Sequence, residues 1–165
     1  MRAFCVILLS PLLLTMAAAQ QSASGDQSMT ADCTFADGNQ ISVQYSTSHK
    51  EEPQNGKVWA PGGSALVLFA QTPLVLNNVQ IPIGGYTAYV IPGKKTWTLI
   101  VSRNTAVGAN YDASQDLVRA SLETAQLSEP ANALRVSFAH MAPKLCNLRL
   151  DYGKTGAFGA DFQEK

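Results

Sequence analysis

Few side chains in this sequence could do acid–base or metal chemistry near neutral pH. Only two histidines, His49 and His140, titrate in that range. His49 stands in a polar run with Glu51 and Glu52, whereas His140 follows a stretch with strand periodicity. Histidine and carboxylate together suit a metal ion or proton transfer, but no H-E-x-x-H or H-x-H spacing joins them here. We therefore favour a solvated loop position for His49 and a hydrogen-bonded structural position on the inward face for His140.

A second group of polar residues, Asp112-x-Ser114-x-Asp116, alternates oxygen ligands as the start of a calcium loop does. The glycine and the bidentate glutamate that such a loop needs are absent from this run. The pattern is more typical of a capped polar loop, in which aspartates accept backbone N–H groups. Arg119 is placed to pair with one of the two aspartates.

No motif for nucleophilic catalysis or phosphate binding is complete. Ser64 follows Gly62-Gly63 but lacks the second glycine of a G-x-S-x-G elbow. Gly84-Gly85 lies between predicted strands rather than before a helix, where a phosphate loop would stand. We expect no cofactor.

The first nineteen residues read as a secretory signal. Arg2 precedes the apolar run 4–14, and Ala17-Ala18-Ala19 places small residues before a cut at Gln20. The run is too short to span a bilayer, which takes about 20 apolar residues. We therefore predict a signal peptide over 1–19, a flexible polar arm over 20–31 and one domain over 32–165. The protein would be exported, to the periplasm or the medium, with no transmembrane segment after cleavage.

Composition limits the partners. The 165 residues include 12 basic and 12 acidic side chains, and 46% are hydrophobic. A balanced charge argues against nucleic acid, which calls for a basic face. A small molecule or another protein is the expected partner.

The cysteines predict one covalent link. Removal of the signal removes Cys5 and leaves Cys33 and Cys146. An even pair in an oxidising compartment predicts a disulfide. Two buried free thiols are the alternative; a metal pair lacks further ligands.

Hydrophobic residues mostly alternate with polar ones at period two, and turn signals recur every ~8–12 residues. This pattern predicts an all-β fold, an antiparallel β-sandwich of about eight or nine short strands. A helix competes only over 117–127, where alanine, leucine and glutamate favour it. The continuous apolar run 65–71 predicts a strand buried on both faces. The candidate strand segments, of which about eight or nine are expected to form strands, lie near 33–35, 41–45, 65–71, 74–76, 79–83, 85–91, 96–102, 117–127, 134–138, 146–150 and, more weakly, 157–162.

Several of these segments resemble a known family in order and spacing. They are 33–35, 57–59, 85–93, 97–101, Tyr111-Asp112, Asp116, Arg119 and Cys146-x-Leu148. The chain resembles the exported bacterial proteins known as domain of unknown function 2911. The resemblance implies an all-β sandwich and brings no established activity. Its motif residues here include Trp59, Tyr86, Trp97, Tyr111 and Arg119.

One departure from that family follows Trp59. Members typically continue with Arg-Thr-Gly-Ala-Asn-Glu, whereas this chain has Ala60 to Ala65, without the arginine, asparagine and glutamate. Any ligand bound by that run in the family is not expected to bind here in the same way.

We predict an exported, non-catalytic binding or scaffold module. The alternative is a hydrolase-like or metal-dependent enzyme, which would need His140 or His49 beside Asp112 or Asp116. A sugar-stacking aromatic platform is a further candidate, although aromatic residues at strand spacing usually belong to the core. The candidate aromatic residues are Trp59, Tyr86, Tyr89, Trp97, Tyr111 and Tyr152.

Overall fold

The computed structural model describes residues 27–48, 52–106 and 110–165, and the predicted signal peptide therefore lies outside the described residues. Strands dominate this part of the chain, with two short 3-10 helices, η1 (Pro61–Gly63) and η2 (Ala113–Gln115). No helix within it is long and apolar enough to cross a membrane. The strands are β1 (Ser28–Thr34), β2 (Gln40–Ser46), β3 (Leu66–Ala70), β4 (Leu74–Leu76), β5 (Val79–Ile81), β6 (Gly84–Ile91), β7 (Thr96–Ser102), β8 (Asp116–Ala142) and β9 (Leu145–Glu164).

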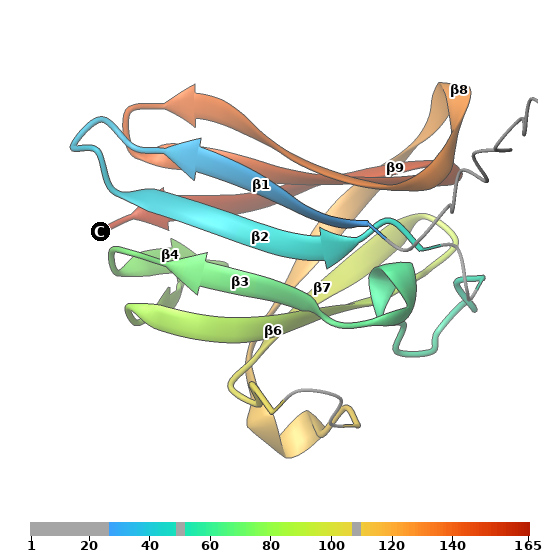
Figure 1. The fold of residues 1–165 in the computed structure, drawn as a ribbon, viewed down its shortest axis with the longest axis horizontal. Helices are drawn as coiled ribbons and strands as arrows, with labels where there is room; N and C mark the ends of the chain where they lie inside the picture. Colours follow the sequence, from blue (N-terminus) through green and yellow to red (C-terminus); the bar gives the residue numbers. More distant parts are fainter. Residues whose placement is uncertain (1–26, 49–51, 107–109) are drawn as a thin grey trace, which may run out of the picture.

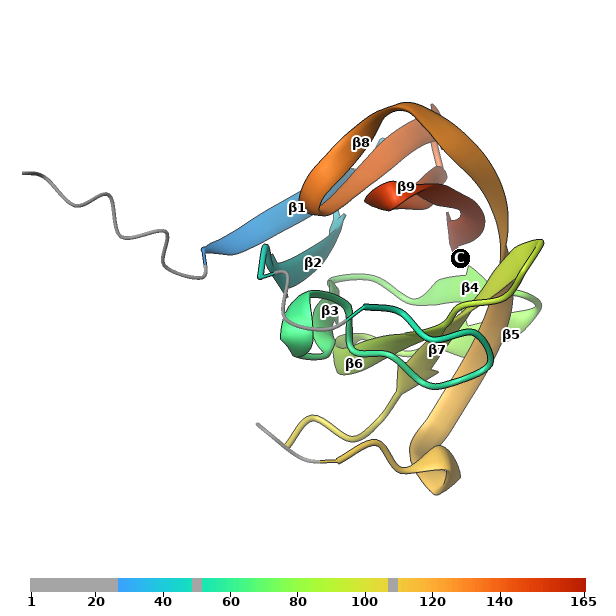
Figure 2. The ribbon, with the colours of Figure 1, turned by 90° about the vertical axis from the view of Figure 1, so that its right-hand side faces the viewer.

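All nine strands belong to one antiparallel sheet, in the order β1-β2-β3-β6-β7-β8-β9-β4-β5. The sheet folds over because β8 rises from η2, crosses the edge of the molecule and continues into the opposite layer (Figures 1 and 2). One layer contains β3, β6 and β7, and the other contains the second half of β8 with β9 (Figure 2). This confirms the predicted all-β antiparallel class.

The core lies between these layers and follows the alternation of the sequence. In β2, Ile41 and Val43 are fully buried, while Gln44 between Val43 and Tyr45 is exposed. In β7, Leu99 and Val101 are fully buried. Side chains one residue apart point to opposite faces of a strand, so a period of two directs one face inward. The largest fully buried side chains include Phe162, Ile41, Leu66, Leu68, Leu74 and Leu148.

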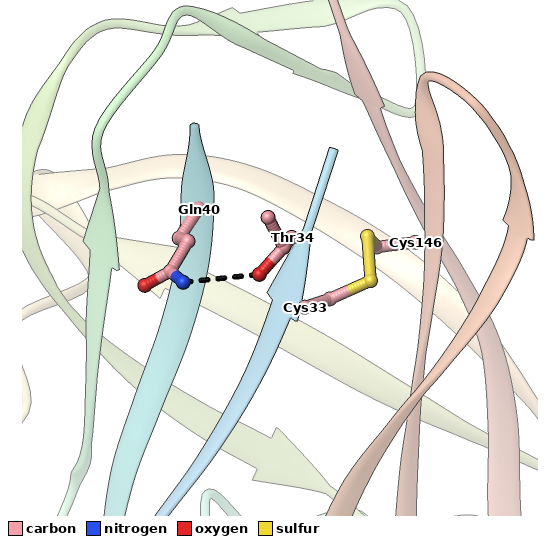
Figure 3. Close-up of a disulfide and its surroundings, with 4 residues drawn as sticks. All are labelled: Cys33, Thr34, Gln40 and Cys146. Atoms are coloured by element: carbon pink, nitrogen blue, oxygen red, sulfur yellow. Dashed lines mark hydrogen bonds between the residues drawn. A yellow bond between two sulfur atoms is a disulfide. The ribbon is translucent and has the colours of Figure 1, made fainter. Parts of the chain in front are cut away.

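A disulfide joins Cys33 of β1 to Cys146 of β9, as predicted (Figure 3). The two Cα atoms are 6.3 Å apart, although the residues are separated by 113 positions in sequence. Beside it, Gln40 Nε2 of β2 donates to Thr34 Oγ1 of β1 at 3.0 Å. The disulfide therefore ties the first strand of the sheet to the layer that contains β9.

The prediction of only short strands was wrong for the second half of the chain. The segments expected at 117–127 and 134–138 form one strand of 27 residues, β8, and those at 146–150 and 157–162 form β9. Ser128 to Pro130 do not end the strand, because the pairing of β8 with β9 shifts register between Gln126 and Ala131. Pro130 lies within this irregularity, where the missing proline N–H breaks no hydrogen bond of the ladder. The helix that competed over 117–127 does not form.

Two further expectations differ from the structure. β1 begins at Ser28, inside the arm predicted over 20–31, because Ser28 to Thr34 pair with β2 from Ser46 back to Gln40. β3 is buried on one face rather than two: Leu66 and Leu68 are fully buried, whereas Phe69 is 42% exposed. A run of apolar residues does not reveal whether a second layer covers the outer face.

Candidate functional site

The outward face of β6, β7 and β8 is covered in part by Tyr111, from the short segment that precedes β8. Tyr89 of β6, Ile100 of β7 and Arg119 of β8 lie opposite one another in the ladder. Tyr89 and Ile100 are buried, although their neighbours in sequence already fill the core on the other face. Tyr111 packs edge-on against Tyr89, with ring centroids 5.1 Å apart. The segment before β8 therefore positions Tyr111 over this face.

Tyr111, Asp116 and Arg119 form a closed hydrogen-bonded group. The Tyr111 hydroxyl donates to Asp116 Oδ2 at 2.8 Å. Arg119 donates to the same oxygen from Nε at 2.9 Å and from Nη2 at 2.7 Å, and Nη2 also donates to the Tyr111 hydroxyl at 2.8 Å. The other carboxylate oxygen, Asp116 Oδ1, is buried and has no hydrogen-bond partner. Three family-motif residues thus meet at the start of β8.

The environment of this group favours the charged form of Arg119 and the neutral form of Tyr111. The hydrogen bond to Asp116 raises the pKa of Arg119, which stays protonated at any physiological pH. Burial, followed by the hydrogen bond to Asp116, raises the pKa of Tyr111, so its hydroxyl stays neutral. The Arg119 side chain is 47% exposed and that of Asp116 is 13% exposed. With half of the guanidinium in water, the ion pair stabilises the fold by about 1 kcal/mol at most.

Arg119 also borders a cleft of about 340 Å³, here called the Arg119 cleft. Thr98 of β7 and Ser121 of β8 face each other in register along its wall. Asn77, in the turn between β4 and β5, donates from Nδ2 to the Arg119 carbonyl oxygen at 2.9 Å. That bond holds the β4–β5 turn against β8. The polar residues that line the Arg119 cleft are Asn77, Thr98, Arg119, Ser121 and Asp161.

Two backbone features shape the turn at this cleft. Asn77 and Asn78 both have positive φ, 48° and 63°. Asparagine tolerates this left-handed region better than most residues and favours tight hairpin turns. On the opposite wall, Asp161 of β9 accepts a hydrogen bond from Asn147 Nδ2 at 2.6 Å. The residues that line the cleft therefore include an arginine, an aspartate, two hydroxyl side chains and an amide.

Asp112 lies beside this group but serves the backbone. Its Oδ1 accepts from the Ser114 backbone N–H at 2.9 Å and caps η2. The hydrogen bonds with Ser114 lower the pKa of Asp112. Asp112 and Asp116 flank one turn of 3-10 helix, and the structure assigns Arg119 to Asp116.

The histidines do not join the aspartates in the described part of the chain. His140 is exposed near the turn from β8 to β9, opposite Cys146, whereas Asp116 begins β8 at its other end. The inward structural position predicted for His140 is therefore wrong: the residue shares the register of Val136 and Phe138, but its side chain is exposed because it lies near the end of β8. His49 lies outside the described residues. Within residues 27–48, 52–106 and 110–165, no group of three or more His, Cys, Asp or Glu could hold a metal ion.

The aromatic candidates divide between core and loop. Trp59 packs edge-on against Trp97 at 6.0 Å and against Tyr152 at 4.8 Å between ring centroids. These three rings are 3–5% exposed and therefore form no open stacking platform. The Tyr86 hydroxyl donates to the Pro82 carbonyl oxygen at 2.8 Å.

Sequence reasoning identified Arg119 but missed its companions in the cleft. Thr98, Ser121 and Asp161 lie in segments whose alternation predicts strands, and that alternation carries no signal of a cleft. The one local signal is the Asn77-Asn78 pair, which is typical of a turn, and binding residues often lie in such connections. Nothing local in the sequence brings that turn to β8.

Neither a curated protein nor a solved structure matches the chain. Residues 26–158 match the family described as "Protein of unknown function (DUF2911)", and they contain the Tyr111–Asp116–Arg119 group, Asn77, Thr98 and Ser121, but not Asp161. Because that match spans most of the sequence, the chain belongs to the DUF2911 family, as the resemblance of its motif residues indicated.

Proposed function

We propose that this protein is an exported, non-catalytic binding module that holds one small polar molecule in the Arg119 cleft. The observation that carries the proposal is the cleft itself, a concavity of about 340 Å³ with five polar residues from four separate parts of the chain. Small-molecule sites generally measure about 300–1,000 Å³. A molecule of monosaccharide or amino-acid size fits this volume.

The chemistry of the lining supports recognition of a hydrogen-bonding ligand. Arg119 and Asp161 supply opposite charges, while Thr98 and Ser121 supply hydroxyls that donate and accept. The bonds to Asp116 and Tyr111 use Nε and Nη2 of Arg119, so among the described residues Nη1 has no hydrogen bond assigned to it. Asp116 and Tyr111 thereby act as positioning residues that fix the guanidinium before a ligand arrives.

Export is supported by the disulfide and by the predicted signal over residues 1–19. Structural disulfides persist in oxidising compartments and are rare in the cytosol. The Cys33–Cys146 bond closes a loop of most of the chain, as suits a domain that must survive outside the cell.

The test is a ligand screen with a blocked cleft. Thermal unfolding of the purified protein is measured against a panel of neutral monosaccharides and free amino acids. A ligand at 100 times its Kd adds ~2.7 kcal/mol and raises Tm by several degrees. Ser121→Trp would fill the cleft at an exposed position, and Ser128→Trp is the matched control on an exposed part of the same strand. We expect the Ser121 variant alone to lose the shift.

Two results would contradict the proposal. Either no panel member stabilises the protein at millimolar concentration, or the Ser121 variant responds as the unmodified protein does. In the second case the ligand would bind elsewhere on the surface.

A further inference from the structure

A second concavity opens at a different place, where the β6–β7 turn meets the middle of β8 and β9. It measures about 250 Å³ and shares no lining residue with the Arg119 cleft. Gln126 of β8 and Thr155 of β9 face each other in register at its edge. We call this concavity the basic mouth, lined among others by Lys94, Trp97, Thr124, Gln126, Lys154 and Thr155.

Two lysines from distant parts of the sequence line the basic mouth. Lys94 comes from the β6–β7 turn and Lys154 from the first half of β9, and both are exposed. Among the described residues neither lysine lies in ion-pair contact with a carboxylate, since the pairs there involve Asp116 and Asp151. Glu123 precedes Thr124 in β8 but is not among the residues that line the mouth. Two uncompensated cations at one concavity attract an anion.

The rest of the lining suits a hydroxylated molecule rather than a bare ion. Thr124 Oγ1 donates to the Lys95 carbonyl oxygen at 2.6 Å, which ties the β6–β7 turn to β8 and leaves the hydroxyl oxygen as an acceptor. Gln126 and Thr155 add further donors and acceptors. Trp97 is also among the lining residues, but it is only 5% exposed and packs against Trp59, so the polar side chains of the mouth carry the recognition.

We propose that the basic mouth binds a small hydroxylated molecule through its oxyanion, a carboxylate or a phosphate group. Lys94 and Lys154 pair with the oxyanion. Thr124, Gln126 and Thr155 bind the hydroxyl groups. A sugar acid and a sugar phosphate both present this combination, and binding at this site requires nothing from the Arg119 cleft.

The experiment measures binding to the purified protein by the fluorescence of its tryptophans and by calorimetry. The probes are galacturonate, galactose 6-phosphate, neutral galactose and inorganic phosphate. We expect at least one of the two charged sugars to bind at least ten-fold more tightly than both galactose and inorganic phosphate, and to weaken as sodium chloride is raised. The comparison of galacturonate with galactose 6-phosphate decides between the two oxyanions.

Matched charge variants separate the site from general attraction. Lys94→Gln/Lys154→Gln should lower the affinity for the charged sugar at least ten-fold, with thermal unfolding in the absence of ligand unchanged. Lys95→Gln/Lys144→Gln removes the same charge outside the mouth and should leave the affinity within about two-fold. The Ser121→Trp variant, blocked at the Arg119 cleft, should also retain binding, which distinguishes the two sites.

The proposal would be overturned by any of four outcomes. Galactose could bind as tightly as its charged derivatives, the control pair could lose as much affinity as the Lys94 and Lys154 pair, or none of the four probes could bind. Inorganic phosphate binding as tightly as the sugars would likewise refute recognition of the hydroxylated ring.

Discussion

Reduction of the Cys33–Cys146 disulfide should destabilise this fold more than any single surface change. The bond closes a loop across 113 positions, and the chain-entropy relation for a loop of that length gives about 5 kcal/mol at 25 °C. Measured disulfides often contribute less, so we expect a loss of about 3–5 kcal/mol. The reason is that the reduced unfolded chain gains conformations that the bond forbids, while β1 stays hydrogen-bonded to β2 in the folded state.

Urea unfolding followed by tryptophan fluorescence measures this loss. The chain beginning at Gln20, which lacks Cys5, is compared with and without reductant. The reduced chain should unfold at a lower urea concentration. In a separate thermal unfolding experiment its Tm should be lower by roughly 10–15 °C. Its m value should also increase, because the unfolded state without a cross-link exposes more surface.

A double variant separates the bond from the thiols. Cys33→Ala/Cys146→Ala removes the link without burying a hydroxyl, which serine would leave at two positions that are 5% and 0% exposed. This variant should match the reduced chain to within the small cost of two lost sulfur atoms. If oxidised and reduced chains unfold at the same urea concentration, the loop argument is wrong and the β1–β2 pairing alone holds the first strand.

Two smaller perturbations test the backbone and the Tyr111 group. Gly62→Ala should cost at least about 2 kcal/mol in urea unfolding, because φ is +78° and the new Cβ would collide with the Ser46 carbonyl oxygen; Gly38→Ala, at φ +90° with open space around it, should cost clearly less. Burial and the bond to Asp116 raise the pKa of Tyr111 above its unfolded value, so its contribution to stability is complete below about pH 10 and is lost as pH rises through the folded pKa. Tyr111→Phe should reduce this loss of stability when the free energy of unfolding is measured across pH 8–12. If the variant loses as much stability over this range as the unmodified protein, the assignment of the loss to Tyr111 is wrong.

The placement of the two proposed sites follows from the path of β8. Its first half carries Arg119 and Ser121 on the outward face, beside the β4–β5 turn. Thr124 and Gln126, a few residues further along the same strand, line the basic mouth. One long strand therefore supplies residues to both concavities. A ligand at either site would hold β8 against a neighbouring turn.

Short-range patterning predicted most strands correctly, since burial on one face imposes a period of two. The alternation around Ile41 and Val43 produced β2, and Pro92-Gly93 marked the turn between β6 and β7. The pattern could not predict that β8 continues past Pro130. A proline ends a strand unless a bulge accommodates it, and here the pairing with β9 determines where the bulge lies.

By itself the sequence determined the strand periodicity, the turn positions and the two cysteines that would meet. These follow from local backbone preferences and from the count of cysteines left after the signal. Only the tertiary structure decided that Asn77 reaches Arg119 and that Lys94 faces the same concavity as Lys154. Each of these pairs joins residues 40 or more positions apart, and their meeting depends on strand order and on the bend of β8, which no local pattern encodes.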